Sequence, residues 1–232
     1  MQNKLIIVIG AYGSGKSEYA INIAKQLQTS SKRVTLVDLD VVNPYFRSRN
    51  MRERFLNDGI DVIAPEGEFM HADLPMLSPR IQGAIDDLIN TVVLDVGGDP
   101  NGCKALGRYI PSIKNRGYQM HLVVNTKRPF TSNKTGIIEM KNTLERASKL
   151  KVTELISNTN LMDNTNINLI KDGINILNDV AQETKIPFNK FLVLKKHSKD
   201  IPDKINGKQK TILEYFLNKP WEMKNKVHMK GI

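Results

Sequence analysis

The sequence predicts an α/β protein with a doubly wound, mostly parallel sheet of about seven strands and helices on both faces. Two observations support this fold class. Short runs of apolar and β-branched residues alternate with segments of helical spacing almost from end to end. Several runs, such as LIIVI and TVVLDV, are almost entirely apolar, which is typical of strands covered by helices on both sides. Because crossovers between parallel strands are right-handed, the helices are expected on both faces of the sheet.

The expected strands and helices alternate in a definite order. The strands cover residues 5–9, 34–38, 60–64, 91–96, 120–125, 153–157 and 191–195. Apolar residues at helical spacing form four faces between them: Ala20, Ile21, Ala24 and Leu27; Ile81, Ala84, Ile85 and Leu88; Ile137, Met140, Leu144 and Ala147; and Ile167, Ile170, Ile174, Leu177 and Ala181. The second helix of this set opens with Ser78, a favourable N-cap, and with Pro79 at the first helical position.

Length and composition predict one folded unit. A chain of 232 residues can bury one sizeable core, so we expect a single domain over 1–232 whose last residues, 222–232, form a basic tail. A content of 40% hydrophobic and 25% charged residues is ordinary for a soluble globular protein and excludes a disordered one. Cys103 is the single cysteine, which excludes an intrachain disulfide and multi-cysteine metal sites; a small buried hydrophobic role is the ordinary interpretation.

No segment predicts secretion or a membrane span. The apolar run after Lys4 is too short for a signal-peptide core, and no stretch approaches the roughly 18 apolar residues of a spanning helix. We therefore expect a cytoplasmic protein. The net charge of +10 suits nucleic acid or another anionic partner, but the scattered lysines and arginines favour a solvated basic surface. Nucleic acid is thus disfavoured but not excluded.

A glycine-rich loop follows the first expected strand. Residues 10–17, GAYGSGKS, match the G-x-x-x-x-G-K-[ST] phosphate loop in full. Gly10, Gly13, Ser14 and Gly15 would let backbone N–H groups and a helix N-terminus converge on an anion, here a nucleotide phosphate. Lys16 would reach the β and γ phosphates, and the hydroxyl of Ser17 would bind Mg²⁺; the alternative is a flexible strand-to-helix turn.

Acidic residues end two further strands. Asp38 and Asp40 are two positions apart, so in an extended segment both side chains point the same way. Asp40 could hold Mg²⁺ through water or orient an attacking water; otherwise it only caps a turn. Arg47 and Arg49 follow it, as candidates for phosphate or acidic-partner contacts or as part of a solvated helix start.

The other acid is Asp95. It ends a strand in the Walker B arrangement and would bind Mg²⁺ through its water shell, unless it is only an acid at a glycine turn. Gly97 and Gly98 follow it and would let the backbone approach a γ-phosphate and move when that phosphate leaves.

Two asparagines at strand ends are candidates for contacting a nucleobase. Asn125 and Asn158 each offer a donor and an acceptor, which a base edge requires. Neither lies in an Asn-Lys-x-Asp motif, so the choice between ATP and GTP stays open. A plain turn is at least as good an interpretation for Asn125. The four histidines are not at metal-ligand spacing, and none is assigned a chemical role.

With these motifs, GAYGSGKS, DLDVVNP and LDVGG, the chain resembles the MinD/ParA-like P-loop NTPases of the CobQ/CobB/MinD/ParA group over nearly its whole length. The resemblance implies residues 10–17 as the nucleotide loop, Asp40 as the residue that positions the hydrolytic water, Asp95 as the Mg²⁺-linked acid and Asn158 as a base contact. It also implies slow, regulated hydrolysis coupled to a partner protein. The signature lysine of MinD and ParA is replaced by Ala11. In this respect the loop is more similar to those of nickel-insertion GTPases of the HypB/UreG type, whose Cys or His ligands we do not find. A trans-acting lysine is therefore not expected, whereas a homodimer remains open.

Three functions fit these residues. The first is a Mg²⁺-dependent NTPase, with ATP favoured over GTP, that acts as a switch or maturation factor for a protein client. The second is a small-molecule phosphotransferase with its acceptor pocket in residues 66–80. The third is a DNA-associated, partition-type ATPase, which the positive charge suggests. The client, the base specificity and the oligomeric state are not determined by the sequence.

Overall fold

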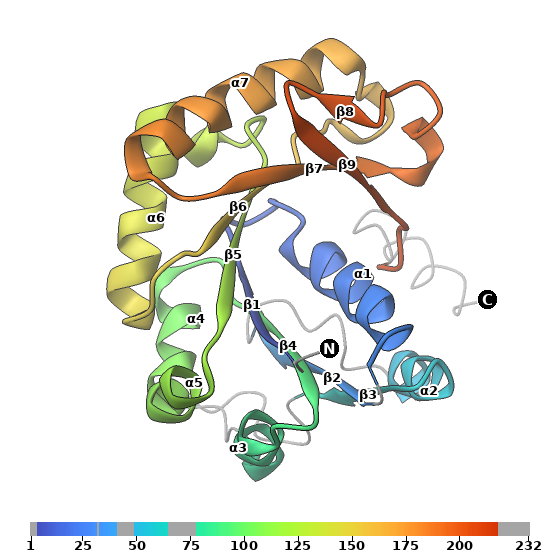
Figure 1. Cartoon of the computed structure of the whole chain (residues 1–232), viewed down its shortest axis with the longest axis vertical. Coiled ribbons are helices and arrows are strands. Elements are labelled where there is room, and N and C mark those ends of the chain that lie inside the picture. Colours follow the sequence, from blue (N-terminus) through green and yellow to red (C-terminus); the bar gives the residue numbers. More distant parts are fainter. Residues whose placement is uncertain (1–3, 32, 41–48, 65–77, 218–232) are drawn as a thin grey trace, which may run out of the picture.

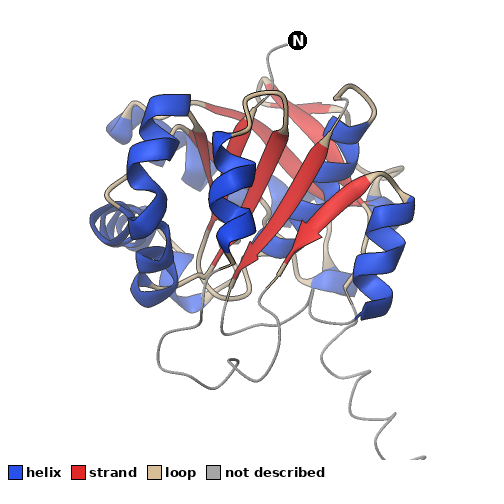
Figure 2. Cartoon of the chain, turned by 90° about the horizontal axis from the view of Figure 1, so that it is seen from below, coloured by secondary structure: helices blue, strands red, loops and turns tan. Residues whose placement is uncertain are grey.

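A computed structural model describes residues 4–31, 33–40, 49–64 and 78–217 and contains one nine-stranded sheet between two layers of helices (Figures 1 and 2). The strand order is β3-β2-β4-β1-β5-β6-β7-β9-β8. All neighbouring strands are parallel except β8 and β9. The strands are β1 Leu5–Ile9, β2 Val34–Leu39, β3 Ile60–Ile63, β4 Thr91–Val96, β5 Gln119–Val124, β6 Glu154–Ser157, β7 Phe188–Leu194, β8 Lys204–Ile205 and β9 Lys208–Leu213.

Helices cover both faces of the sheet. One face carries α1 (Lys16–Gln28) and α2 (Arg49–Asn57). The other carries α3 Pro79–Asp86, α4 Pro100–Lys104, α5 Ile110–Arg116, α6 Lys134–Ser148 and α7 Ile167–Thr184. Alternate residues of β1 enter the two cores, Ile6 and Val8 on the α1 side and Ile7 and Ile9 on the other. A strand buried on both faces must be apolar throughout, which explains the LIIVI sequence.

The predicted fold class is confirmed, with two more strands than expected. The hairpin of β8 and β9 was missed because the sequence of β9, KQKTIL, is largely polar. A signal was present in Asn206-Gly207, whose φ angles of 47° and 76° form the tight turn between these strands. β9 adds to the sheet parallel to β7 and so extends the sheet beyond the last predicted strand.

The boundaries of the strands in the structure agree closely with those expected from the sequence, and the agreement is poorer at one helix. β1 and β4 have the expected bounds, whereas β7 begins at Phe188 and ends before Lys195. Ser78 caps α3 by accepting the N–H of Arg80, as predicted. The inclusion of Leu88 in that helix was wrong, since α3 ends at Asp86 and Leu88 is 65% exposed. The reason is Asp87, whose extended backbone stops the helix and whose carboxylate accepts the N–H of Ile89.

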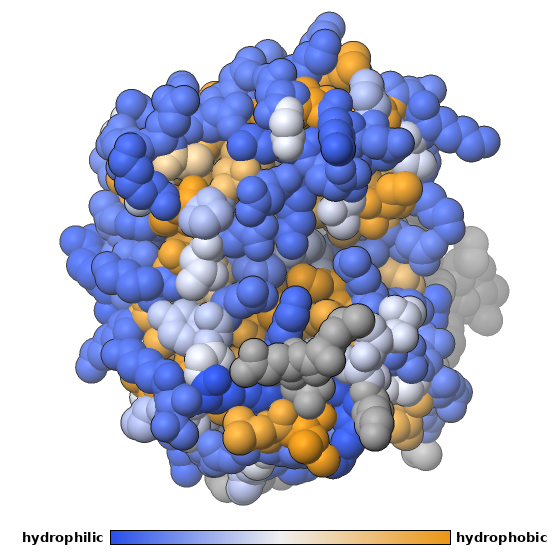
Figure 3. Space-filling view, in the orientation of Figure 1, coloured by the Kyte–Doolittle hydropathy of each residue, from blue (hydrophilic) through white to orange (hydrophobic). Residues whose placement is uncertain are grey.

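Several predicted features lie outside the described residues. These are Asn43-Pro44, Arg47, most of the 66–80 segment and the basic tail 222–232, while Arg49 begins α2. Among the described helices, none is long and apolar enough to cross a membrane. The face seen in Figure 3 is mostly hydrophilic, with hydrophobic patches between charged side chains.

After β9 the chain crosses α1 as a short C-terminal strap, residues 214–217. The side chain of Asn22 pairs with the backbone of Glu214, donating to its carbonyl and accepting its N–H, both at 2.9 Å. The carboxylate of Glu18 accepts the N–H groups of Phe216 and Leu217, the latter at 2.7 Å. The N-terminal half of α1 is therefore held between the sheet and the strap.

One polar network lies within the apolar layer under α1. His121 on β5 is 2% exposed, and its Nδ1 lies 3.0 Å from the hydroxyl of Tyr19. Its Nε2 lies 3.3 Å from a carboxylate oxygen of Glu154. Burial, followed by the charges of Lys190 and Lys4, lowers the pKa of His121 to about 3. The partly exposed Glu154 does not offset these effects, so the imidazole is neutral at pH 7.

This buried imidazole gives the protein a pH-dependent stability. The unfolded chain binds a proton at His121 with a pKa near 6.5, but the folded chain does so only near 3. The stabilisation is therefore complete above 6.5 and is lost as the pH falls, by up to about 1.4 kcal/mol per pH unit. Urea unfolding between pH 4 and 8 measures it. His121→Gln should flatten this slope, and a slope equal to that of the wild type would contradict the expectation.

Candidate functional site

The site lies at the edge of the sheet where the carboxyl ends of the parallel strands are found. The loops that follow these strands therefore lie close together. β1 lies between β4 and β5, and β2 lies on the far side of β4. The register aligns Asp95 of β4 with Val8 of β1 and with Asp38 of β2. The carboxyl ends of β1, β2 and β4 therefore meet, and the predicted phosphate and metal residues lie at these strand ends or shortly after them.

The loop of residues 10–15 passes from β1 into α1 in the way that the glycine pattern predicts. Gly15 has φ 86°, in the left-handed region, and a Cβ on it would lie 2.2 Å from Nδ2 of Asn158. Lys16 and Ser17 follow as the first two residues of α1, and both are buried. The N-terminus of a helix of 13 residues thus opens directly after the loop, a favourable position for an anion.

Two side chains from neighbouring loops hold the carbonyl groups of the phosphate loop. Nδ2 of Asn158 donates to the carbonyl of Ser14 at 2.7 Å, and Nε of Arg128 donates to that of Gly13 at 3.0 Å. Because C=O and N–H point in opposite directions across a trans peptide, the Gly15 N–H faces away from Asn158. Arg128 was not predicted; its place four residues after the end of β5, at the same sheet edge, was the available signal.

A buried ion pair joins the loops after β1 and β2. Nζ of Lys16 donates to Oδ2 of Asp40 at 2.6 Å, and both side chains are nearly inaccessible. Asp38 accepts the backbone N–H of Asp40 at 2.9 Å, which fixes the position of the turn. Burial alone would lower the pKa of Lys16, but the charges of Asp95 and Asp40 outweigh it and raise that pKa. Lys16 is therefore a stable cation at the end of the loop.

Asp95 is another buried acid beside the ion pair of Lys16 and Asp40. Burial raises the pKa of its carboxyl to about 6, against the opposing effects of the Lys16 charge and a hydrogen bond with the side chain of Ser17. Its Oδ1 is buried and has no hydrogen-bond partner among the described residues, and the same is true of Oγ of Ser14. Buried polar atoms are normally paired, so these oxygens mark a place for a ligand.

The donor set fits Mg²⁺. Ser17, Asp40 and Asp95 offer only oxygen atoms, which this ion prefers. Within the described ranges, no group of three or more His, Cys, Asp or Glu side chains is arranged to hold a metal by itself. That is compatible with Mg²⁺, which commonly takes one or two carboxylates and completes its shell with water and phosphate oxygens.

The segment after β4 packs on the phosphate loop. A Cβ on Gly98 would lie 2.6 Å from the carbonyl oxygen of Gly10 and 3.0 Å from the N of Tyr12. The carbonyl of Gly97 accepts a weak hydrogen bond from Sγ of Cys103 at 3.8 Å. Burial raises the pKa of this thiol to about 12, which supports the expected role of Cys103 as a buried, unreactive side chain.

The structure brings most of the predicted site residues together. Lys16, Ser17, Asp40 and Asp95 form one cluster beside the loop, and Asn158 lies against it. The side chain of Asn125 makes hydrogen bonds within two turns. Its Oδ1 accepts the N–H of Lys127, and its Nδ2 donates to the carbonyl of Asn160. It joins the turns after β5 and β6, as the turn interpretation expected. The chemical roles of the other residues stay predictions.

Comparison with known proteins supports the fold. The sequence matches no protein-family model, and no curated protein matches it significantly. The structure is similar to the cell division protein FtsY from Thermotoga maritima, with TM-score 0.56 and 20% identity over 83% of this chain. It is also similar to FtsY from Mycoplasma mycoides, with TM-score 0.53 and 15% identity over 83% of this chain.

The likeness extends over part of the FtsY structures only. This chain covers 62% and 60% of the two FtsY chains. At these identities the likeness shows that the α/β fold with its mostly parallel sheet is shared, and the resemblance to MinD and ParA stays a prediction.

The contact between Gly98 and the phosphate loop leads to a prediction. A methyl group from Gly98→Ala should push residues 10–12 aside and destabilise the protein by about 1–3 kcal/mol. Gly83→Ala, in α3, is the matched control because a Cβ there meets nothing within 4 Å. Urea unfolding gives the stability, and amide NMR shifts report the loop. Unchanged Gly10 and Tyr12 amides in Gly98→Ala would contradict the contact.

Proposed function

We propose that the protein is a Mg²⁺-dependent nucleoside triphosphatase with slow hydrolysis, which acts as a nucleotide-controlled switch or maturation factor for a partner protein. The observation that carries the proposal is the buried cluster of Lys16, Asp40, Asp95 and Ser17 beside a complete phosphate loop. Isolated buried charges are costly, so a cluster of this kind at a loop of this shape is typical of a functional site.

Lys16 and the loop would bind the phosphates. Lys16 is paired with Asp40 in this structure, and the β and γ phosphates would compete with that carboxylate for the ammonium group. The backbone N–H groups of the loop and of the first turn of α1 would donate to the phosphate oxygens. Asn158 and Arg128 would keep the loop in place by holding its carbonyl groups.

Ser17 and Asp95 would hold the metal. Three carboxylates, of Asp38, Asp40 and Asp95, act on the ammonium of Lys16, and the same negative charges would attract a divalent cation. When bound, Mg²⁺ supplies neutralisation of the phosphate charge. The free Oδ1 of Asp95 and the hydroxyl of Ser17 are the groups that would face it, directly or through water.

Asp40 would position the attacking water. Its carboxylate lies beside Lys16, at the end of the loop where the terminal phosphate is expected. Once Lys16 pairs with the phosphates, the Asp40 oxygen that accepts from Lys16 in this structure would accept a hydrogen bond from water and orient the water for in-line attack. Gly98 lies close to Gly10 and Tyr12 of the phosphate loop. A change in the loop on loss of the terminal phosphate would therefore also move the segment after β4.

ATP is the nucleotide we expect, since residues 125–128, Asn-Thr-Lys-Arg, lack the Asn-Lys-x-Asp motif of guanine-specific enzymes. Asn158 is the proposed base contact.

The kinase alternative depends on residues 66–80, which lie largely outside the described residues, and the DNA alternative depends on charge alone. Phosphate release without an added acceptor would favour the NTPase over the kinase. DNA retention that requires ATP and falls between about 50 and 200 mM salt would favour the partition-type protein.

Lys16→Ala tests nucleotide binding. Loss of the ammonium group should weaken ATP and GTP binding by about 100-fold or more in calorimetry, because the charge-assisted contacts to two phosphates disappear. Circular dichroism should show an intact fold. Lys114→Ala, an exposed lysine of α5, is the control and should bind like the wild type. Undiminished ATP and GTP binding by Lys16→Ala would contradict the proposed function.

Asp40→Asn separates binding from hydrolysis. Nucleotide affinity should be equal to or tighter than that of the wild type, since the carboxylate that pairs directly with Lys16 is gone. Phosphate release under single-turnover conditions should slow by about 100-fold or more because the water loses its acceptor. Asp172→Asn, an exposed change in α7, serves as the control. Wild-type hydrolysis by Asp40→Asn would rule out this role for Asp40.

A further inference from the structure

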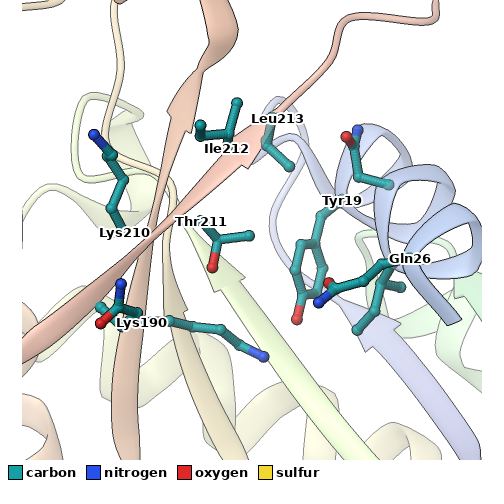
Figure 4. A pocket seen from close by; sticks show the side chains of 10 residues that line it. Tyr19, Gln26, Lys190, Lys210, Thr211, Ile212 and Leu213 are labelled. Carbon is teal, nitrogen blue, oxygen red and sulfur yellow. The ribbon is translucent and has the colours of Figure 1, made fainter. Parts of the chain in front are cut away.

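A cavity of about 540 Å³ lies between α1 and strands β7 and β9 (Figure 4). Tyr19 and Gln26 line it from α1, and Lys190 and Thr211 line it from the strands. It is formed by none of the residues assigned to the nucleotide. Its volume is within the usual range for small-molecule sites, roughly 300–1,000 Å³.

Polar groups from both walls converge on this space. In Figure 4 the side chain of Lys190 extends toward Tyr19 and Gln26, and the hydroxyl of Thr211 points to the same space. Nζ of Lys190 lies 3.7 Å from the nearest carboxylate oxygen of Glu154, longer than a direct hydrogen bond. The ammonium group therefore keeps donors for a ligand.

The neighbouring charges favour an anion. Lys190 and Lys4 both act on His121, which is neutral, and Glu154 is the acid beside them. Nε2 of His121 lies 3.3 Å from a carboxylate oxygen of Glu154 but makes no hydrogen bond within the described residues, and Nδ1 lies 3.0 Å from the hydroxyl of Tyr19. The oxygen of Tyr19 keeps lone pairs for a ligand donor. The cavity thus offers the ammonium group of Lys190 together with neutral side chains that can donate or accept, among them Tyr19, Gln26 and Thr211.

The rest of the wall is partly apolar and also contains Gln209 and Lys210 of β9, and the ammonium group of Lys210 donates to the carbonyl groups of Ser198 and Ile201. Ile23 lines the cavity from α1, and Ile212 and Leu213 line it from β9. Asn22, also at the wall, is tied to Glu214, so the strap fixes the distance between α1 and β9 at one end of the cavity. A ligand with one charged end and a compact apolar body matches this distribution.

We propose that this cavity binds a small organic anion, a carboxylate or a phosphate ester, whose charged group pairs with Lys190 and whose body lies between Gln26, Thr211 and Ile23. This site is additional to the nucleotide site and does not depend on the proposed function. It lies on the helix that begins with Lys16 and Ser17.

The test is a titration of the ¹⁵N-labelled full chain, followed by amide NMR, with benzoate and phenyl phosphate as anionic probes and benzyl alcohol as the uncharged one. We expect saturable shifts at Tyr19, Ile23 and Thr211 with at least one anionic probe, and about tenfold weaker binding of benzyl alcohol. The stronger of the two anions identifies carboxylate or phosphate ester as the natural class. Amide shifts at Gly13 to Ser17 would instead indicate binding at the phosphate loop. Because each amide is assigned to its residue, binding at the two sites can be told apart.

Two variants make the result specific. Lys190→Gln should weaken the anionic probe about tenfold or more, and the control Lys204→Gln, which removes an exposed lysine of β8, should not. Thr211→Ile keeps a β-branched residue in the strand, fills the cavity and should abolish the shifts there. No shift at the cavity with either anion at millimolar concentration, equal binding of benzyl alcohol, or full binding by Lys190→Gln would overturn the proposal.

Discussion

The ammonium group of Lys16 is buried, and much of the site follows from the need to compensate that charge. A buried cation without a partner would cost several kcal/mol, so carboxylates must be delivered to it from other parts of the chain. Asp40 makes the direct contact, while Asp38 and Asp95 come from adjacent strands in register. Only a parallel arrangement of β1, β2 and β4 brings these strand ends to one edge. The sheet order and the charge cluster therefore depend on each other.

Helix α1 connects three parts of the molecule. Its first residues form the end of the phosphate loop, its next turns hold the C-terminal strap through Glu18 and Asn22, and Tyr19 contacts the buried His121. Burial raises the pKa of Glu18 to about 7, although the N–H groups of Leu217 and Phe216 oppose this by favouring the carboxylate. A shift of α1 would therefore change the phosphate loop, the strap and the wall of the cavity together.

The features that were predicted correctly depend on short stretches of sequence. A strand such as β4 is apolar because both its faces are buried, and the loop before Lys16 needs glycines because of its backbone conformation. The features that were missed depend on distant parts of the chain. Arg128 reaches Gly13 across 115 positions, and β9 is a strand because it pairs with β7 despite its polar sequence. Leu88 fits the helical period, but Asp87 stops the helix first.

The sequence by itself determined the alternating α/β order, the phosphate loop and the acids that follow β2 and β4, because each is encoded by local periodicity or by a contiguous motif. Tertiary structure decided which of those acids pairs with Lys16, which side chains hold the loop carbonyls, and that Asn125 serves a turn. It also created the cavity beside α1, whose walls come from residues nearly two hundred positions apart. Charge pairing and cavity formation depend on distances in space, and only the packing of helices on the sheet sets those distances.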